Sequence, residues 1–419
     1  MMQAEGPLSG LSLRERGLLF AGLAVLSMGQ ATLIPAFGLT SRDAGLSEAQ
    51  VGVIMSVSAL IVVFAAPWWG GVCDRIGRKP VFVLGLVGFW VTTLAFLLAM
   101  HGSEAGWLGS GALFAALLAI RAAYAATASG ALPAASGLIA DTSLPEVRSS
   151  AMSLTGIAFS AGALAGTGLV YAFAPRLGAL GPLAIVCGVG IVVSAGAVLG
   201  LRPPVRATPP CGDKQTSRIA SGPLIPVLAV SFAACTAMSM IQFIMPYALQ
   251  DAGGLATAQA VQSASGLAFV LSLSTIGSLW LASRSRLPEY RQVRFGLMVV
   301  AAGALCLALV SQAWGQVVAH VMLGAGFGFF VPAVQGLVSL RVGPTHQAGA
   351  AGLLSAATTA GYIVGPVLGA SLYAQSVTLA FTAAAALTVV ALLIGWWVGV
   401  GLIRETGPVA SPVAGTDLG

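Results

Sequence analysis

Long apolar stretches alternate with short polar segments along the whole chain. Each stretch holds about 19 residues or more, the length that an α-helix needs to cross a bilayer. The pattern predicts twelve membrane-spanning helices, near 16–39, 49–71, 81–101, 107–131, 150–173, 179–201, 224–249, 260–283, 295–313, 315–339, 349–374 and 378–402.

A polar, Pro-rich segment, "RPPVRATPPCGDKQTSRIASG" at 202–222, divides the predicted helices into two sets of six. Its composition is that of a linker. We therefore expect an N-terminal six-helix bundle over 1–201, a cytoplasmic linker over 202–222, and a C-terminal six-helix bundle with a tail over 223–419. The fold class predicted is an all-α integral membrane protein.

Two short patterns recur at equivalent places in the two sets. "GALAG" at 162–166 in the fifth span matches "GPVLG" at 365–369 in the eleventh, and Pro35 in the first span matches Pro246 in the seventh. This repetition favours two pseudo-symmetric bundles. Secondary transporters are often built from such parallel repeats, with the substrate site at their interface.

Composition agrees with the membrane assignment, because the chain is 57% hydrophobic and only 8% charged. A soluble protein of 419 residues does not cover that much apolar surface with so few charges. With the N-terminus inside, 16 of the 19 Lys and Arg residues fall on the cytoplasmic side. Arg42 and Arg176 fall outside, and Arg121 lies within a span. This asymmetry predicts a multi-pass plasma-membrane protein with both termini in the cytoplasm, and it explains the net charge of +6 without a nucleic-acid partner.

Signatures of enzymes are missing from the sequence. No HExxH, GxSxG or nucleotide-binding loop appears, and no span carries paired carboxylates. The five cysteines are scattered, without the spacing of metal ligands. We therefore expect no enzymatic activity, no cofactor and no metal.

The stretch "GGVCDRIGRKPVF" at 70–82 places a cluster of charges between the second and third spans. Its spacing, set by Gly70, Asp74, Arg75, Gly77, Arg78 and Lys79, resembles the signature of the major facilitator superfamily, roughly G-x-L-x-D-R-x-G-R-K, with Val72 in place of the usual Leu. The first half as a whole, with "GLSEAQVGVIMS" at 45–56, looks most like the 12-span drug and metabolite exporter branch.

The resemblance implies a conformational gate at this loop, with no substrate contact. Its expected members are Gly70, Asp74, Arg75, Gly77, Arg78 and Asp141. Asp74 is expected to face the helix start at 343–349, where free N–H groups and the helix dipole favour an anion. Arg78 is expected to pair with Asp141 at the cytoplasmic end of the fourth span.

Arg121 is the one Lys or Arg at mid-membrane depth, where a charge costs about 2.5 kcal/mol or more. The surrounding "RAAYAATASG" at 121–130 resembles the family's fourth-span pattern, R-x-x-x-G, with Ala125 replacing the glycine. Three interpretations stand open. Arg121 holds an anionic group of the substrate, tunes coupling within a hydrogen-bonded network, or extends into a polar cavity without a ligand.

The acidic residues leave the source of coupling open, because none lies clearly at the membrane midplane. Where many drug exporters of the family carry a carboxylate in the first span, this chain has Gln30. His320 is the remaining titratable candidate for coupling beside Arg121, although a packing role explains a lone histidine equally well. Proton coupling is thus implied by the resemblance alone.

The family's antiporter motif, roughly G-x-x-x-G-P-x-x-G-G, is degenerate in the fifth span. "FSAGALAGTG" at 159–168 keeps Gly162 and Gly166 but replaces the proline by Ala163. The eleventh span has the fuller form, "GYIVGPVLGA" at 361–370. We expect these glycine-lined helices to serve rocking at the interface of the halves.

The first, fourth, seventh and tenth spans line the central cavity in this family. The resemblance therefore implies a substrate site drawn from their polar and adaptable side chains. Its expected members are Arg121, Gln30, Tyr124, Gln242, Phe243, Tyr247, Met28 and Gln335.

These features together predict a monomeric secondary active transporter in a lipid bilayer. Its expected activity is export of a small amphipathic compound, a drug or a secreted metabolite such as a siderophore, by proton-coupled alternating access. The alternative is uptake or exchange of an organic anion bound at Arg121.

Overall fold

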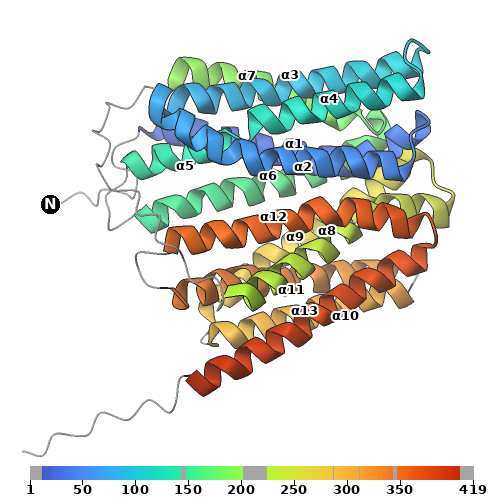
Figure 1. The fold of residues 1–419 in the computed structure, drawn as a ribbon. Helices are drawn as coiled ribbons and strands as arrows, with labels where there is room; N and C mark the ends of the chain where they lie inside the picture. Colours follow the sequence, from blue (N-terminus) through green and yellow to red (C-terminus); the bar gives the residue numbers. More distant parts are fainter. Residues whose placement is uncertain are drawn as a thin grey trace, which may run out of the picture.

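The computed structural model describes residues 12–142, 148–201, 224–285, 287–310, 312–342 and 347–405 (Figure 1). Within these ranges its regular secondary structure is helical: α1 (Leu13–Asp43), α2 (Glu48–Ile76), α3 (Arg78–Glu104), α4 (Ser110–Ala128), α5 (Ala131–Thr142), α6 (Arg148–Leu177), α7 (Gly181–Gly200), α8 (Ile225–Gly253), α9 (Thr257–Arg284), α10 (Glu289–Leu309), α11 (Ala313–Leu340), α12 (Gln347–Tyr373) and α13 (Val377–Glu405). Twelve spans among the described residues are long and apolar enough to cross a membrane. The prediction of an all-α, twelve-span membrane protein is confirmed, and the predicted linker at 202–222 lies outside the described residues.

The two sets of helices pack in the same way. In the N-terminal half α1 packs against α6 and α7, α3 against α4 and α7, and α2 against α4. In the C-terminal half α8 packs against α12 and α13, α10 against α11 and α13, and α9 against α11. Figure 1 shows these halves as an upper and a lower group. The matching neighbours are those expected for two copies of one six-span bundle.

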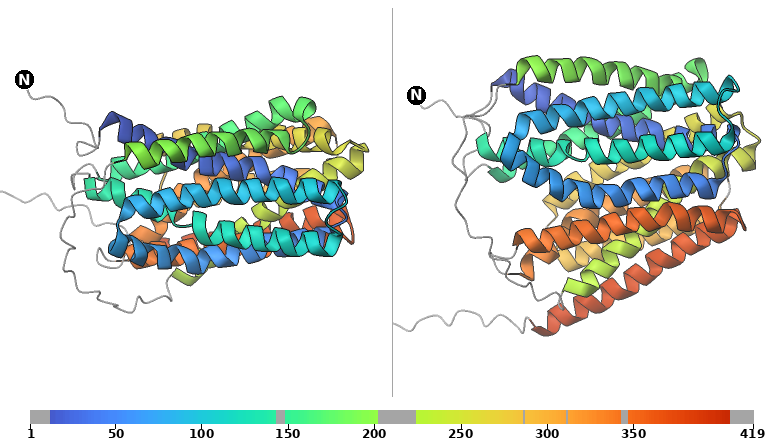
Figure 2. Two further views of the ribbon diagram at one scale, coloured as in Figure 1. Left: turned by 90° about the horizontal axis from the view of Figure 1, so that it is seen from above. Right: turned by 45° about the horizontal axis from the view of Figure 1, so that its top comes forward.

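The helices of both halves run between the same two ends of the molecule (Figure 2). One end carries Ser12, the turn at Gly77 and residues 287–288, together with most of the arginines outside the spans. We call it the basic end. The opposite end carries the turns at 44–47 and 254–256, among others.

The first two helices begin at serine caps. The Ser12 hydroxyl accepts a hydrogen bond from the Glu15 backbone N–H, and the Glu15 carboxylate accepts one from the Ser12 N–H. Ser47 and Gln50 form the same arrangement at the start of α2. Each reciprocal pair satisfies two N–H groups that a helix start otherwise leaves free. These caps fix where α1 and α2 begin.

The fourth span is longer than predicted and is broken in the middle. The sequence predicts one helix at 107–131, whereas the structure continues through α5 to Thr142 after a turn at Ser129 and Gly130. The break leaves the Ala126 carbonyl without its usual helical donor, and the Trp69 indole N–H donates to it. The Trp69 ring also packs on Gly130, where an added Cβ would lie 2.9 Å from it. A side chain of α2 thus stabilises the break, which local sequence patterns do not reveal.

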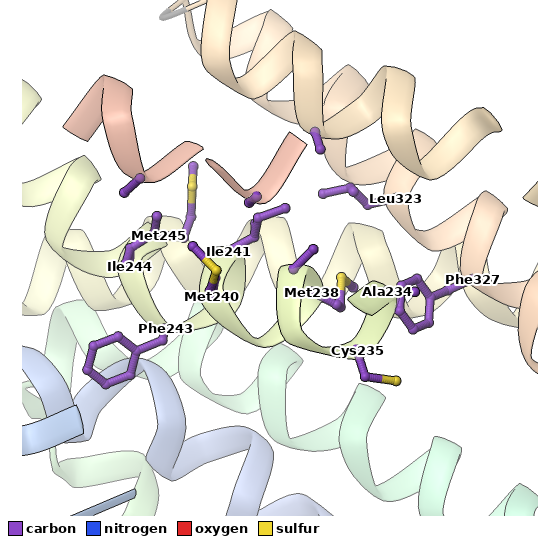
Figure 3. Close-up of a cluster of buried hydrophobic side chains, with 14 of the residues drawn as sticks. Ala234, Cys235, Met238, Met240, Ile241, Phe243, Ile244, Met245, Leu323 and Phe327 are labelled. Atoms are coloured by element: carbon purple, nitrogen blue, oxygen red, sulfur yellow. The ribbon is translucent and has the colours of Figure 1, made fainter. Parts of the chain in front are cut away.

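The core of the C-terminal half is built around α8. Met238, Ile241, Ile244 and other apolar side chains cover its faces, and Phe327 of α11 packs beside them (Figure 3). This apolar cluster continues into the N-terminal half near the opposite end, where it includes residues of α1, α2, α3 and α6. The basic-end part of the N-terminal half has a separate core. The halves therefore share a hydrophobic core at the opposite end.

Candidate functional site

The cavity beside Arg121 lies within the N-terminal half. Its lining comes from four helices: Gly29, Gln30 and Leu33 of α1, Phe89, Thr92, Thr93 and Phe96 of α3, Ile120, Arg121 and Tyr124 of α4, and Leu183 of α7. Its volume of about 20 Å³ is enough for a water-sized species. No described residue of the C-terminal half lines it.

Arg121 is the charged group of this cavity. Its side chain is 5% exposed, and its guanidinium carbon lies 4.8 Å from the centre of the Tyr124 ring. The ring face attracts the cation electrostatically. The buried Nε of Arg121 has no hydrogen-bond partner among the described residues, and no carboxylate lines the cavity. A full positive charge is therefore buried here without a counter-charge from the described part of the chain.

Gln30 and Tyr124 extend the polar side of the cavity. The two side chains line the same cavity, one from α1 and the other from α4. Phe89 of α3 packs edge-on against Tyr124, with ring centres 6.4 Å apart. The remaining lining is mostly apolar, so the three polar groups face one small space. The structure thus brings together three of the eight predicted substrate residues.

The other five predicted substrate residues lie elsewhere. Met28 and Gln242 are half-buried, and Gln335 is exposed on α11. Phe243 and Tyr247 are buried in α8 with ring centres 5.6 Å apart. None of the five lines the Arg121 cavity. A single pocket formed by all eight residues is not present in this conformation of the described chain.

Tyr247 belongs to a contact cluster at the opposite end that the sequence analysis missed. Arg42 of α1 donates two hydrogen bonds to the Asp251 carboxylate of α8, at 2.7 and 3.2 Å. Arg42 also pairs with Glu48 at 3.0 Å and lies 5.7 Å above the Tyr247 ring. We call Arg42, Glu48, Tyr247, Asp251 and Tyr373 the opposite-end cluster.

Further hydrogen bonds strengthen this cluster. The Tyr373 hydroxyl of α12 donates to Asp251, and Thr257 of α9 donates to Asp43 of α1 at 2.6 Å. A sequence signal for the cluster exists: Arg42 and Asp251 carry opposite charges near the ends of α1 and α8, whose internal prolines, Pro35 and Pro246, match each other in the two halves. That signal becomes visible only when the two halves are aligned with each other.

Two pairs of helices continue the contact between the halves. In the first pair, the Ser56 hydroxyl of α2 donates to the Ile363 carbonyl of α12, and Gly52 packs on Pro366. In the second pair, Gln262 of α9 donates to the Tyr171 carbonyl of α6. These contacts lie in the portions of the helices nearest the opposite end. The halves are thus joined at the end distant from the basic loops.

Gly162 and Gly166 of the fifth-span motif pack within their own half, whereas Gly168 faces Phe269 of α9 across the boundary between the halves. A Cβ at Gly162 would lie 2.1 Å from the Ala24 carbonyl oxygen of α1, and one at Gly166 would lie 2.5 Å from that of Met28. Gly361 and Gly365 of α12 approach α8 equally closely. These glycines permit close packing of α6 on α1 and of α12 on α8, while the two helices also pack across the boundary between the halves, α6 on α9 and α12 on α2. Their expected role in rocking stays a prediction.

The charged segment after α2 also makes its described contacts within the N-terminal half. Gly77 has a φ of +95°, which allows the turn into α3. Arg78 pairs with Asp141 of α5 at 3.3 Å, the contact that the sequence analysis expects, and Lys79 donates to the Val198 carbonyl of α7 at 3.0 Å. This segment thus ties α3 to α5 and α7.

The remaining predicted gate residues are less constrained. Arg75 is exposed, and Gly70 has open space around it. The Asp74 side chain and residues 343–346, which were expected to face each other, lie outside the described parts. Their expected contact stays a prediction.

His320 lies on α11, inside the C-terminal core. Its side chain is 4% exposed, and Nδ1 is 2.7 Å from the Gln316 carbonyl oxygen one helical turn away. It does not line the Arg121 cavity. Within the described ranges no group of three or more His, Cys, Asp or Glu residues has the arrangement of a metal site.

Comparison with known proteins identifies the family of the chain. The model of the Major Facilitator Superfamily matches residues 19–343 and 227–416. The class B tetracycline resistance protein of Escherichia coli is 26% identical over 364 residues, covering 84% of this chain and 86% of that protein. The quinolone resistance protein NorA of Staphylococcus aureus is 20% identical over 370 residues, covering 85% of this chain and 89% of that protein.

Solved structures share the fold. A bacterial homologue of the human lysosomal transporter Spinster, in an inward-facing and unoccupied conformation, matches with a TM-score of 0.72 and 18% identity, covering 96% of this chain and 100% of that one. A D-xylose–proton symporter matches with a TM-score of 0.70 and 17% identity, covering 92% and 98%. At these identities the likeness concerns the arrangement of the helices.

Proposed function

The chain belongs to the Major Facilitator Superfamily, and we propose that it exports a small amphipathic compound from the cell. The observation that carries this proposal is the similarity, over more than four-fifths of both chains, to resistance proteins named for tetracycline and for quinolones. Substrates of that kind combine aromatic rings with polar groups. Export places the chain in the plasma membrane, and the excess of Arg and Lys at the basic end favours a cytoplasmic position for that end.

Transport proceeds in this proposal by alternating access of a monomer. The described contacts between the halves lie near the opposite end, which supports the assignment of this conformation to the state closed toward the cell exterior. Opening to the exterior requires rupture of the opposite-end cluster. Gly70, Asp74, Arg75, Gly77, Arg78 and Asp141 then form the gate at the basic end.

The substrate site of the exporter draws on both halves. Gln30, Tyr124 and Arg121 contribute from the N-terminal half, while Met28, Gln242, Phe243, Tyr247 and Gln335 contribute as the halves move apart. Proton coupling is assigned to Arg121 and His320. Two supports for this assignment are the unpaired, buried guanidinium and the isolated buried imidazole.

A second candidate function is uptake or exchange of an organic anion. The observation favouring it is the Arg121 charge, which no described carboxylate neutralises. In this alternative the anion enters from the C-terminal half and meets the guanidinium as the cavity widens. Such transport would depend on Arg121 and be insensitive to pH.

The test is accumulation of tetracycline and a fluoroquinolone in inside-out membrane vesicles with an imposed pH gradient. Export predicts accumulation that collapses with the gradient. Arg176→Ala, which removes an exposed arginine near the opposite end, serves as the control for Arg121→Ala. Gradient-independent exchange of organic anions, without accumulation of either drug, would replace the export proposal by the alternative.

A further inference from the structure

The charge balance around Arg121 is incomplete within the described chain. Its side chain is 95% enclosed by protein, since 5% of it is exposed, and its Nε is buried with no hydrogen-bond partner. The ion pairs of Arg42 and Arg78 lie away from the cavity. Because the interior screens charge poorly, an isolated guanidinium there is unfavourable unless a negative charge lies beside it.

The cavity offers further hydrogen-bond donors to such a charge. The Gln30 amide carries two N–H groups and the Tyr124 hydroxyl one O–H group, so even if these two side chains bond to each other, at least one donor stays free. The hydroxyls of Thr92 and Thr93 donate to carbonyl oxygens of their own helix, which uses their protons. The free donors therefore come from α1 and α4, on the side where Arg121 lies.

Size and polarity limit what fits. About 20 Å³ accepts a single water-sized species, which excludes a carboxylic acid of drug size in this conformation. Phe89, Phe96 and Leu183 make the rest of the wall apolar. A monatomic anion satisfies the guanidinium and the free donors, whereas a water molecule leaves the charge unbalanced.

We propose that the cavity formed by Gln30, Arg121 and Tyr124 is a binding site for chloride. The bound ion is a resident of the N-terminal half that neutralises Arg121 and holds α1 and α4 together. The site uses three residues that the proposed function also assigns to the substrate and to coupling, so chloride occupies them in this conformation, while binding of the ion does not depend on which compound is exported. A chloride site also differs from the organic-anion alternative, because an organic anion of substrate size is too large for the cavity in this conformation.

The first experiment measures thermal unfolding of the purified full chain in sodium gluconate, with chloride replacing gluconate at constant ionic strength. A ligand that binds only the folded state raises the unfolding temperature with its concentration. We expect a saturable rise with chloride and with bromide. The rise should vanish in Arg121→Gln and persist in Arg176→Gln, which removes an exposed arginine of equal charge. Equal unfolding temperatures in chloride and gluconate would overturn the proposal.

The second experiment does not depend on a variant that folds. Crystals of the wild-type chain grown with bromide in place of chloride should show an anomalous scattering peak between the Arg121 guanidinium and Gln30. Ordered water without an anomalous peak in the cavity would overturn the proposal. A stronger stabilisation by acetate than by chloride would also overturn it, by assigning the site to carboxylates. Neither experiment involves transport, so failure of the export proposal leaves their outcome unaffected.

Discussion

Arg42 of α1 donates two parallel hydrogen bonds, of 2.7 and 3.2 Å, to Asp251 of α8 across the boundary between the halves. A guanidinium and a carboxylate joined in this way have a fixed orientation as well as an attraction. The pair lies at the opposite end, where the two halves share an apolar core. Separation of the halves at this end therefore has to break a defined contact.

The first prediction concerns this pair. Both side chains are partly exposed, at 33% and 39%, so we expect Arg42→Ala to change overall stability by less than about 1 kcal/mol. An energy of about 1 kcal/mol nevertheless changes the ratio between the conformations closed and open at the opposite end about fivefold. Spin labels at positions 105 and 375, in two turns of the opposite end on different halves, should show a larger long-distance population in Arg42→Ala.

Arg176→Ala is the matched control, because Arg176 is exposed near the same end. Its distance distribution should equal that of the wild type. Asp251→Asn, which keeps the shape of the side chain, should resemble Arg42→Ala. Unchanged distributions in both cluster variants would show that the ion pair does not hold the halves together.

A second prediction concerns the close packing of α6 on α1. In Gly162→Ala the new Cβ would meet the Ala24 carbonyl oxygen at 2.1 Å, so the helices must separate. We expect a loss of about 1–3 kcal/mol of stability. Thermal unfolding of the detergent-solubilised chain measures it. Gly156→Ala on the same helix has nothing within 4 Å of its Cβ, and it should unfold at the wild-type temperature or above. Equal unfolding temperatures for the two variants would contradict the packing argument.

The broken fourth span gives a third prediction. Trp69→Phe removes the shorter of two side-chain hydrogen bonds to the Ala126 carbonyl, which then keeps the Ser129 hydroxyl at 3.4 Å. The loss of one buried hydrogen bond is expected to destabilise the chain by about 1–3 kcal/mol. Trp68→Phe is the neighbouring control, because the Trp68 side chain is 61% exposed. Thermal unfolding should separate the two variants, and a Trp69→Phe protein as stable as Trp68→Phe would show that the break does not need this donor.

A fourth prediction concerns the pair Arg78 and Asp141. Asp141→Asn removes the charge that Arg78 contacts at 3.3 Å, while it keeps the size of the side chain. If this segment gates the basic end, transport should slow several-fold while the affinity for the substrate stays the same. Vesicle transport rates and a binding titration measure the two quantities separately. A change in affinity without a change in rate would contradict a gating role.

The number and the order of the spans follow from local properties of the sequence. An apolar stretch of about 20 residues forms a membrane-crossing helix because its backbone groups must bond to each other in lipid. Clusters of arginine, which identify the basic end, are likewise visible in short segments of the sequence. The twelve spans and the repetition of their packing in two halves were therefore predictable without coordinates, as was the deep burial of Arg121.

The faces of those helices were not predictable in the same way. Spans such as α8 are apolar on almost every side, so no polar stripe indicates which residues face a cavity. Only packing showed that Gln30 and Tyr124 share a cavity with Arg121, while Gln242 lies apart from it. The kinked fourth span depends on Trp69, which lies 57 residues from its partner Ala126.

The sequence by itself determined the helices, the end at which basic residues gather and the positions of unusual charge, because each depends on residues within one or two helical turns. The tertiary structure decided which charges meet. Arg42 and Asp251 are separated by 209 residues, and their contact depends on how two complete bundles dock. Docking is set by the shape and the packing of whole helices, which no single segment of the sequence encodes.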